Sequence, residues 1–527
     1  MRFCIAFVAL LFFSFADAAG TCTKRTYDQD SFVCVCTEKS CDQIDPVGDL
    51  SKGQVYVYST SLKSDRLKQS IKYFDARPDE NIRTVINTSK VYQEILGFGG
   101  AITDAVALLR NDVSKRSKAL AELLHQQYFG SKGLQYTIGR VPIASCDFSV
   151  SAYSFLETEN DFHLKNYKFD DIKADYLQKI MKDVPEMNLF ASPWSAPGWM
   201  KESGQMIGGG IMKGPFNRRF YLAYARYIIR FFEEYQKLGV PFWGFTVQNE
   251  PDTGALDNYP FQTMYMSAQM QRDWVNLRLG PMMKNNWVTK DIKIMAGDGW
   301  RNMSYSTAET VYNVYKDASA VPGDYTSGLA VHWYESNTPF AALSDVHKLK
   351  PDKFILATEA CNSYEAKDQI PYFGRWMSAE LYAHDIIQDL RNWVVGWTDW
   401  NVWLDTWGGP NLVGNFVDAP IIINITDSNI EFFKQPMFYA LGHFSKFIPP
   451  GSKIVDLYID GFDGGSEDDL LEGIAALTPD GNVVFVVQNR ETSYTYDLEI
   501  DDLTHSNQVI RLSVPPKSIQ TLIWKKK

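Results

Sequence analysis

The stretch FWGFTVQNEPDTG, residues 242–254, begins with apolar and β-branched residues and turns polar at Asn249 and Glu250. This composition predicts a buried strand with a carboxylate at its carboxyl end. The stretch KFILATEACNS, residues 353–363, repeats the pattern and reaches Glu359 where its apolar run ends. Two glutamates in matching positions at strand ends suggest a fold in which those ends face one another.

Segments with strand-like composition recur between stretches with helical patterning. In order, they are EILGFGG (94–100), YTIGRVP (136–142), LFASPW (189–194), FWGFTVQ (242–248), IKIMAGD (292–298), LAVHWY (329–334), FILAT (354–358) and VVGWTDW (394–400). Residues 114–128 and 217–238 place apolar side chains at helical spacing. Strands that alternate with helices form a parallel sheet, and eight of them favour closure into a (β/α)8 TIM barrel of the α/β class. The alternative is a doubly wound open sheet, but GFGGAI (97–102) lacks the last glycine of the phosphate-binding loop typical of that fold.

The C-terminal part of the sequence has a different, strand-rich pattern. GIAALTPDGNVVFVVQNR (473–490) contains two strand-like runs around a Pro-Asp-Gly turn, and YTYDLEI (494–500) and SIQTLIW (518–524) continue the alternation. We therefore predict an additional all-β, sandwich-like domain, which the N-terminal segment could join. The predicted organisation is a signal peptide (1–18), an N-terminal disulfide-containing β segment (19–92), the catalytic barrel (93–448) and a C-terminal β-sandwich domain (449–527).

The N-terminus predicts entry into the secretory pathway. Arg2, the apolar run IAFVALLFFSF (5–15) and ADAAG (16–20) match a signal peptide that is cleaved after Ala18 or Ala19. The run is too short to span a bilayer, and no later stretch has the roughly eighteen apolar residues of a membrane helix. We therefore expect the mature protein within the secretory or endolysosomal system.

Cysteine usage agrees with a secreted chain. A dense, even cluster lies near the mature N-terminus, at Cys22, Cys34, Cys36 and Cys41. Such a cluster favours two local disulfides over a zinc site. Cys146 and Cys361 lie far apart in sequence and are interpreted as unpaired buried thiols. Three sequons are consistent with glycosylation during secretion, at Asn87, Asn302 and Asn424.

Composition and missing motifs exclude several classes of function. A net charge of −11 gives no basic footprint, so nucleic acid is not expected as a partner. The sequence contains no H-E-x-x-H motif and only 7 histidines, which argues against a zinc hydrolase. It also contains no G-x-S-x-G elbow and no Walker A loop. GGGIMKG (208–214) is interpreted as a mobile rim loop rather than a phosphate cradle.

Polar and aromatic residues follow the predicted barrel strands, whose carboxyl ends share one mouth. In chain order they are Asp147, Trp194, Asn249, Glu250, Asp298, His332, Tyr334, Glu359, Asp399 and Trp400. The fourth and seventh strands lie on roughly opposite sides of such a barrel, so Glu250 and Glu359 can approach each other across the mouth. Glycosidases that retain configuration use two carboxylates about 5 Å apart, one as acid/base and one as nucleophile.

Electrostatics gives the two glutamates separate roles. Two unit charges about 5 Å apart repel by roughly 3 kcal/mol at an effective dielectric constant of about 20. One glutamate therefore ionises first, and the other keeps its proton for the leaving oxygen. The alternative for each glutamate taken alone is a buried acid bonded to Arg or Tyr. Asp298 and Asp399 could equally be buried groups that orient the mouth, and His332 is expected to bond to an acid rather than to a metal.

With these residues assembled, the chain resembles the lysosomal glucosylceramidases (acid β-glucosidases) of glycoside hydrolase family 30. The matching motifs are GFGGAITDA (97–105), RVPIASCDFS (140–149), ASPWSAP (191–197), NEP (249–251), YPF (259–261), VHWY (331–334), TEAC (358–361), VVGWTDWN (394–401), NFVDAPIII (415–423) and KQPMFYALGHFSKFIP (434–449). NEP alone occurs in many barrel glycosidases, whereas the ordered set is specific and covers nearly all of the mature chain. The resemblance implies a retaining enzyme on a (β/α)8 barrel with an added β domain.

The resemblance also implies roles for individual residues. Carried over by motif, Glu250 resembles the acid/base and Glu359 the nucleophile, and Asn249 would donate to the sugar 2-hydroxyl. Residues that would hold the other glucose hydroxyls and the ring are Asp147, Trp194, Trp400 and Asn415. A supporting shell around the carboxylates is implied at Arg140, His332 and Tyr334, and an aromatic entrance for a lipid tail at Tyr259 and Phe261. The family's two-disulfide start implies Cys22–Cys34 and Cys36–Cys41.

The activity implied by the resemblance is hydrolysis of glucosylceramide to glucose and ceramide at a membrane surface, in the lysosomal lumen, without a cofactor or metal. It further implies a saposin-type activator and anionic lipids as partners, with peripheral membrane association and no transmembrane helix. The rim segments 251–258 and 360–373 differ from the family pattern, and such segments govern the aglycone. One alternative is a related retaining barrel glycosidase that acts on soluble β-glucosides, β-xylosides or β-1,6-glucans, or a secreted enzyme of this kind. The other is a catalytically silent carbohydrate- or lipid-binding protein.

Overall fold

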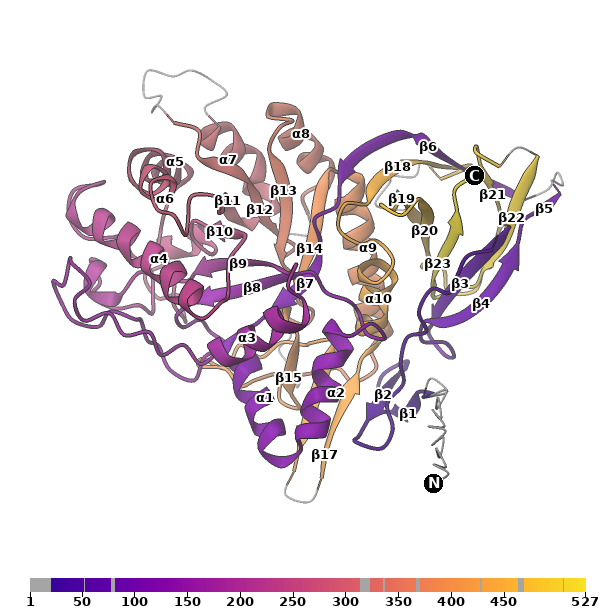
Figure 1. Cartoon of the computed structure of the whole chain (residues 1–527), viewed down its shortest axis with the longest axis horizontal. Coiled ribbons are helices and arrows are strands. Elements are labelled where there is room, and N and C mark those ends of the chain that lie inside the picture. The colour runs from indigo at the N-terminus through magenta and orange to yellow at the C-terminus, as the bar shows by residue number, and fades with distance from the viewer. Residues whose placement is uncertain are drawn as a thin grey trace, which may run out of the picture.

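The chain folds into three sheets with helices around one of them. The computed structural model describes residues 20–51, 53–76, 81–312, 323–334, 337–365, 370–426, 429–462, 469–505 and 507–527. The predicted signal peptide lies outside these residues. Figure 1 shows a helix-covered barrel on one side of the molecule and a large, strongly twisted sheet on the other.

Eight parallel strands close into a barrel, which confirms the predicted fold class (Figure 1). In chain order they are β7 (Gly97–Ala101), β8 (Ile138–Ile143), β9 (Asn188–Pro193), β10 (Gly244–Thr246), β11 (Lys293–Trp300), β12 (Thr326–His332), β13 (Phe354–Glu359) and β14 (Val394–Asn401). Each predicted strand overlaps one of these. The barrel closes where β14 pairs with β7. Gly99 permits the close approach of β7 to β8, because a Cβ there would collide with the carbonyl oxygen of Ile138.

Helices follow the barrel strands and form the outer layer. They are α1 (Asp104–Arg116), α2 (Lys118–Phe129), α3 (Ala174–Asp183), α4 (Arg219–Lys237), α5 (Ala268–Trp274), α6 (Gly280–Lys284), α7 (Ser304–Val311), α8 (Ala341–Leu349), α9 (Trp376–Arg391) and α10 (Pro436–Ser445). Short turns of other helix types are Gly198–Met200, Pro251–Ala255, Val275–Leu279 and Arg301–Met303. Ser117 separates α1 from α2, because its extended backbone ends the first helix and its hydroxyl accepts from the N–H of Leu120 in the second.

The helix α4 illustrates how sequence pattern becomes packing. The apolar residues whose spacing predicted this helix are all buried: Phe220, Ala223, Tyr224, Tyr227, Ile228 and Phe231. Side chains three and four positions apart lie on one face of a helix, so this stripe covers the barrel. The predicted helix at 114–128 corresponds to the end of α1 and almost all of α2.

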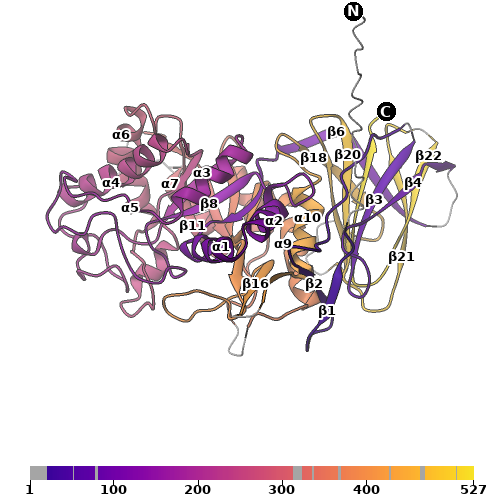
Figure 2. The same ribbon diagram turned by 60° about the horizontal axis from the view of Figure 1, so that its bottom comes forward.

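A ten-stranded sheet forms the additional all-β domain, and it contains both N- and C-terminal segments as predicted. Its strands are β3 (Gln54–Ser61), β4 (Lys68–Tyr73), β5 (Asp75–Ala76), β6 (Ile82–Glu94), β18 (Lys453–Ile459), β19 (Leu471–Leu477), β20 (Asn482–Asn489), β21 (Tyr496–Asp502), β22 (Gln508–Val514) and β23 (Ser518–Lys525). In Figures 1 and 2 the indigo and purple strands from the N-terminus lie among the yellow strands from the C-terminus. Val57, Phe485, Leu498 and Trp524 pack in its core. The strands β18 and β22 were not recognised in the sequence.

The disulfide-bearing strands join a different sheet from the rest of the N-terminal segment. The order in this five-stranded sheet is β1 (Thr23–Thr26), β2 (Phe32–Cys36), β17 (Ile430–Lys434), β16 (Ile421–Ile425) and β15 (Trp403–Asp405). The disulfides are Cys22–Cys34 and Cys36–Cys41. The N-terminal segment therefore divides between two sheets, because β2 pairs with β17 of the chain that follows the barrel.

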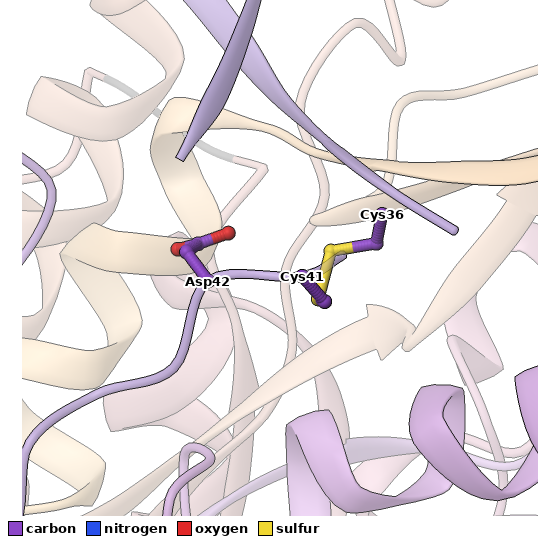
Figure 3. Close-up of side chains that lie close together, drawn as sticks. All are labelled: Cys36, Cys41 and Asp42. Atoms are coloured by element: carbon purple, nitrogen blue, oxygen red, sulfur yellow. A yellow bond between two sulfur atoms is a disulfide. The ribbon is translucent and has the colours of Figure 1, made fainter. Parts of the chain in front are cut away.

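Asp42 anchors the end of this disulfide-bearing segment. Figure 3 shows Asp42 directly after the Cys36–Cys41 disulfide. Its carboxylate lies 2.9 Å from Nζ of Lys434 and accepts a hydrogen bond of 2.7 Å from Tyr439. Lys434 lies on β17 and Tyr439 on α10, so a buried ion pair ties the N-terminal segment to the chain that follows the last barrel strand.

The barrel and the ten-stranded sheet are joined through two helices. Figure 2 places α9 and α10 between them, where α9 contacts β19 and β20 and α10 contacts β23. Among the described helices, none has the length and apolar character that crossing a membrane would require. Of the three sequon asparagines, Asn302 is exposed and the other two are half-buried.

Candidate active site

Two glutamates meet at the mouth of the barrel. Glu250 follows β10, and Glu359 is the last residue of β13. One carboxylate oxygen of each, together with a ring nitrogen of His332, lies within a group whose atoms are all within 4.8 Å of one another. The Glu250 side chain is 12% exposed and that of Glu359 is 8% exposed, so both are nearly enclosed but can be reached from the mouth.

Glu250 has an unusual backbone conformation that aims its side chain. Its φ of 39° and ψ of 59° are left-handed, a conformation that non-glycine residues rarely adopt. Its N–H donates to the carbonyl oxygen of Asp298 at 2.7 Å, and its carbonyl accepts from the N–H of Thr253 at 3.0 Å. Such strain persists only where neighbouring bonds enforce it, and it is typical of functional sites.

Arg140, on β8, connects the groups on both sides of the mouth. Its fully buried guanidinium donates to Glu359, to Asp298 at 2.9 Å and to Oδ1 of Asn249 at 2.8 Å. Burial alone would lower the pKa of Arg140, but Asp298 and Glu359 raise it. The planar fork of an arginine can hold several acceptors at once, so this side chain orients both Glu359 and the residue before Glu250.

Asp298 is a carboxylate with no exposure to solvent and four donors. Oδ2 accepts from Arg140 and from Thr246 at 2.7 Å, and Oδ1 accepts from Thr358 at 2.7 Å and lies 3.1 Å from Nε2 of His332. Although burial raises the pKa of Asp298, Arg140 and His332 hold it well below its ordinary range. Asp298 is therefore ionised at every physiological pH.

His332 lies between Asp298 and Glu250 and contacts a carboxylate oxygen of each. Since ionised Asp298 can only accept, Nε2 of His332 must donate to it, and Nδ1 then faces Oε1 of Glu250 at 3.2 Å. A neutral imidazole accepts the proton of a carboxylic Glu250, and an imidazolium donates to its carboxylate. Burial lowers the pKa of His332, but Glu359, Asp298 and Glu250 together raise it to about 9. His332 therefore keeps its proton at acidic and neutral pH.

Glu359 is surrounded by donors. Tyr334 donates to Oε1 of Glu359 at 2.8 Å, and Arg140 donates to the other oxygen. Burial raises the pKa of Glu359, although His332 and Arg140 act in the opposite direction. Both donors favour the ionised form of the carboxylate. The hydroxyl of Tyr334 also lies 3.3 Å from the sulfur of Cys361, one of two buried cysteines outside the disulfides.

The remaining residues of the implied sugar pocket gather beside the two glutamates. The indole rings of Trp194 and Trp400 stack with centroids 5.2 Å apart, and both lie beside the guanidinium of Arg140. The amide of Asn415 donates to Oδ2 of Asp147 at 2.8 Å. Burial raises the pKa of Asp147 to about 7 even though this bond opposes the shift. These polar groups and indole faces form a surface suited to a hexose.

The two aromatic residues assigned to the entrance lie next to Glu250. The hydroxyl of Tyr259 is 3.5 Å from Oε2 of Glu250, at the limit of a hydrogen bond. The ring of Phe261 packs edge-on against that of Tyr259, with centroids 4.6 Å apart. Both side chains are half-buried, so they line one side of the mouth.

Sequence reasoning missed several polar residues that support this site. Ser192, Thr246 and Thr358 are fully buried in barrel strands; Ser192 accepts from Arg140 at 3.2 Å, and the two threonines donate to Asp298. The available signal was a small hydroxyl residue in an otherwise apolar strand. Asp399 proved to be separate from the glutamates: it accepts from Tyr382 at 2.6 Å on the outer side of β14.

The two glutamates and His332 are also spaced as metal ligands could be. However, the guanidinium of Arg140 contacts Glu359, and both ring nitrogens of His332 are engaged. Few ligand atoms remain free, and a divalent cation would repel the guanidinium. We therefore interpret this cluster as an acid–base site. The cysteines of a second such cluster, Cys36 and Cys41 beside Asp42, are bonded to each other.

A closed (β/α)8 barrel, two facing carboxylates at its mouth and an attached β-sandwich define a glycoside hydrolase. Residues 95–448 match the glycosyl hydrolase family 30 TIM-barrel domain, and residues 459–522 match the glycosyl hydrolase family 30 beta sandwich domain. The chain therefore belongs to glycosyl hydrolase family 30.

Full-length relatives narrow the comparison within the family. The chain is 42% identical to "Putative glucosylceramidase 3" of Caenorhabditis elegans, across 100% of this chain and 99% of the relative. It is 37% identical to the lysosomal acid glucosylceramidase of Mus musculus, across 97% of each. Among solved structures, SrfJ from Salmonella typhimurium has a TM-score of 0.76 at 26% identity, over 90% of this chain and 100% of that one. An endo-β-1,6-glucanase has a TM-score of 0.73 at 25% identity, with the same coverage.

Proposed function

We propose that this protein is a retaining β-glucosidase that hydrolyses glucosylceramide to glucose and ceramide. The observation that carries the mechanism is the approach of Glu250 and Glu359, whose nearest carboxylate oxygens are within 4.8 Å. An inverting enzyme needs about 6.5–9.5 Å between its carboxyl groups to admit a water, whereas a retaining enzyme needs about 5–5.5 Å. The shorter spacing supports a covalent intermediate.

In the first step, an oxygen of Glu359 attacks the anomeric carbon, and Glu250 transfers its proton to the glycosidic oxygen. Ceramide leaves as an alcohol, and glucose remains esterified to Glu359. In the second step, Glu250 removes a proton from water as the water attacks the anomeric carbon. The ester bond breaks, Glu359 regains its charge and Glu250 regains its proton. Asn249, oriented by Arg140, is placed to donate its amide N–H to the 2-hydroxyl.

Two observations support the lipid substrate and the acidic compartment. They are the similarity to glucosylceramidases and the exposed apolar side chains around the barrel mouth. Two full-length relatives carry the name glucosylceramidase. Large apolar side chains are exposed at the end of a barrel strand, at Trp300, and on segments that follow barrel strands, at Leu256, Trp407 and Phe416. We propose that this rim contacts a membrane surface in the lysosomal lumen, with anionic lipids and a saposin-type protein as activators, and that the three sequons are glycosylated.

A second candidate is hydrolysis of β-1,6-glucan. It is favoured by one observation, the TM-score of 0.73 with an endo-β-1,6-glucanase. The two functions share the sugar and the mechanism and differ in the group that leaves. A comparison of substrates can therefore distinguish the two functions, and its result does not depend on which residues are catalytic.

The test combines substrate comparison with chemical labelling. Purified protein is incubated at pH 5 with glucosylceramide in anionic vesicles, with a soluble aryl β-glucoside and with β-1,6-glucan oligosaccharides. We expect glucose and ceramide from the first, and faster release of glucose from lipid than from glucan. A β-glucoside epoxide should label Glu359, and Glu359→Gln should bind substrate but lose turnover by roughly three or more orders of magnitude. Preferred cleavage of glucan would select the second candidate, and labelling elsewhere would reassign the nucleophile.

A further inference from the structure

The rim of the barrel mouth contains a buried lysine that the proposed mechanism does not use. Lys201 follows β9, and its side chain is 0% exposed. Its ammonium group donates to three backbone carbonyl oxygens, those of Met206 at 3.1 Å, Gly208 at 2.8 Å and Thr263 at 2.6 Å. Burial lowers the pKa of Lys201 to about 8, and no ion pair with it is formed within the described ranges.

The bonds of Lys201 join two segments that are distant in sequence. Gly208 begins the glycine-rich rim loop, Met206 lies two residues before it, and Thr263 follows the aromatic residues of the entrance. An ammonium group has three N–H donors, and here all three are used on carbonyls. Burying a charge without an opposite charge costs several kcal/mol unless every donor is satisfied. An apolar side chain of the same length would avoid this cost but would leave three carbonyls unpaired.

The two segments form a single surface, which we call the entrance wall, comprising residues 201–210 and 251–265. The N–H of Gly208 donates to the carbonyl of Phe261 at 3.0 Å, and that of Gly210 donates to Gly254 at 2.8 Å. The segments approach so closely that a Cβ on Gly209 would lie 2.5 Å from the carbonyl oxygen of Leu256. Lys201 thus closes one end of a backbone ladder that glycines make possible.

The entrance wall is bonded directly to the segment that carries Glu250. The hydroxyl of Thr263 lies 2.7 Å from that of Thr253, which donates to the carbonyl of Glu250 at 2.8 Å. Tyr259 lies on the same wall and reaches toward the carboxylate of Glu250. The carbonyl of Thr263 accepts from Lys201, and the hydroxyl of Thr263 is linked through Thr253 to the backbone of Glu250. Lys201 is therefore connected to the proposed acid.

We propose that Lys201 is a positioning residue that fixes the entrance wall and thereby selects the aglycone. This inference rests on the proposed function, because a leaving group protonated by Glu250 must depart past Tyr259 and Phe261. Lys201 does not touch the sugar. Its removal lets the wall separate, which displaces the surface that a large aglycone contacts but leaves the bonds around Glu359 in place.

The test measures how the loss of Lys201 depends on the size of the leaving group. Lys201→Met is compared with the wild type on glucosylceramide in vesicles, on short- and long-chain alkyl β-glucosides, and on an aryl β-glucoside. We expect kcat/KM for the lipid and the long-chain glucoside to fall at least roughly tenfold more than for the two small substrates, mainly through KM, because misplacement of a binding surface acts on the groups that contact it. The rate of labelling by a β-glucoside epoxide without an aglycone should stay within about twofold.

Two further variants keep the test decisive. Lys213→Met is the matched control, since Lys213 lies on the same loop and donates to one carbonyl, that of Trp199 at 3.0 Å; its substrate ratio should match the wild type. Gly209→Ala forces the same two segments apart while Lys201 is kept, and it should reproduce the altered ratio. If Lys201→Met does not fold, Gly209→Ala decides the matter. Equal losses on all substrates, or none, would overturn the proposal.

Failure of this inference can be told apart from failure of the proposed function. If the wild type does not hydrolyse glucosylceramide, the proposed substrate is wrong, and the alkyl glucosides still report whether Lys201 affects large aglycones. If the wild type hydrolyses the lipid and the variants lose activity on all substrates alike, the proposed substrate is retained and the proposed role of Lys201 is wrong.

Discussion

Nε2 of His332 lies 3.1 Å from Oδ1 of Asp298, and this bond requires that Nε2 carry a hydrogen. Asp298 is ionised and can only accept, so the second nitrogen of His332 is left to share a proton with Glu250. A residue that touches no substrate in the proposed mechanism thereby sets the protonation of the acid catalyst.

We predict that Asp298→Asn lowers kcat by roughly 100-fold, because an amide cannot accept from four donors and the mouth must rearrange. The same change removes a negative charge beside His332, whose pKa is about 9 in the wild type. His332 then loses its proton at lower pH, so the alkaline limb of the kcat/KM profile should move toward acid. Asp399→Asn, at a buried aspartate bonded to Tyr382, is the control and should leave this limb in place.

Glu250→Gln tests the acid role directly. A glutamine keeps the shape of the side chain but has no proton to give to the leaving oxygen. Turnover of alkyl glucosides should fall by about 10²–10⁴-fold, the usual contribution of general acid catalysis. A nitrophenyl glucoside, whose leaving group needs no proton, should form the glycosyl-enzyme nearly as fast as before, measured as a burst of nitrophenol. Equal losses with both substrates would contradict the assignment.

Arg140→Lys should be far from conservative. The guanidinium holds Glu359, Asp298 and Asn249 at once, whereas an ammonium group lacks the planar fork that reaches all three. We expect kcat/KM to fall by roughly 100-fold or more and stability to fall by about 3 kcal/mol, because buried carboxylates lose partners. Arg226→Lys, at a residue of α4 that donates to one carbonyl, should change neither kinetics nor melting temperature appreciably.

The protein should be more stable at acidic than at neutral pH. Burial and the neighbouring Asp385 raise the pKa of Asp389, on α9, well above 3.8, and one of its oxygens has no hydrogen-bond partner among the described residues. A raised folded-state pKa means that the folded form binds the proton more tightly. Its stabilising effect is complete below the unfolded value and is lost as pH rises toward the folded one.

Asp389→Asn removes this titration. The melting temperature of the wild type should drop between pH 5 and pH 7, and that of the variant should drop less, with a difference of about 2 °C or more at pH 7. Asp345→Asn, at an exposed aspartate, serves as the control and should behave as the wild type does. Parallel pH curves for Asp389→Asn and the wild type would show that other groups cause the change.

The barrel could be predicted because each of its strands has a local signature. A short β-branched or apolar run, such as FILAT, is buried on both faces of a parallel sheet, so its composition reflects its environment. The strands β18 (KIVDLYI) and β22 (QVIRLSV) have a similar β-branched and apolar composition, so the same reasoning could have predicted them. The position of β2 was missed because its partner β17 lies nearly four hundred residues away.

The candidate site was predictable in part for the same reason. Residues at the carboxyl ends of barrel strands must share one mouth, so Glu250, Glu359 and His332 could be placed near one another from strand counting alone. Lys201, by contrast, carries no such positional signal in the sequence. Its burial depends on three carbonyls supplied by folded loops, and nothing in its sequence neighbourhood specifies them.

By itself, the sequence determined the alternation of strands and helices, the disulfide-forming cysteine cluster, and the strand ends at which the acidic residues lie. These properties follow from local composition and periodicity, which short segments express on their own. Only the tertiary structure decided that Glu250 and Glu359 approach within 4.8 Å, that Asp298 orients His332, and that the N-terminal strands divide between two sheets. Such relationships depend on hydrogen bonds and pairings between residues far apart in the chain, and these form only when the whole barrel has closed.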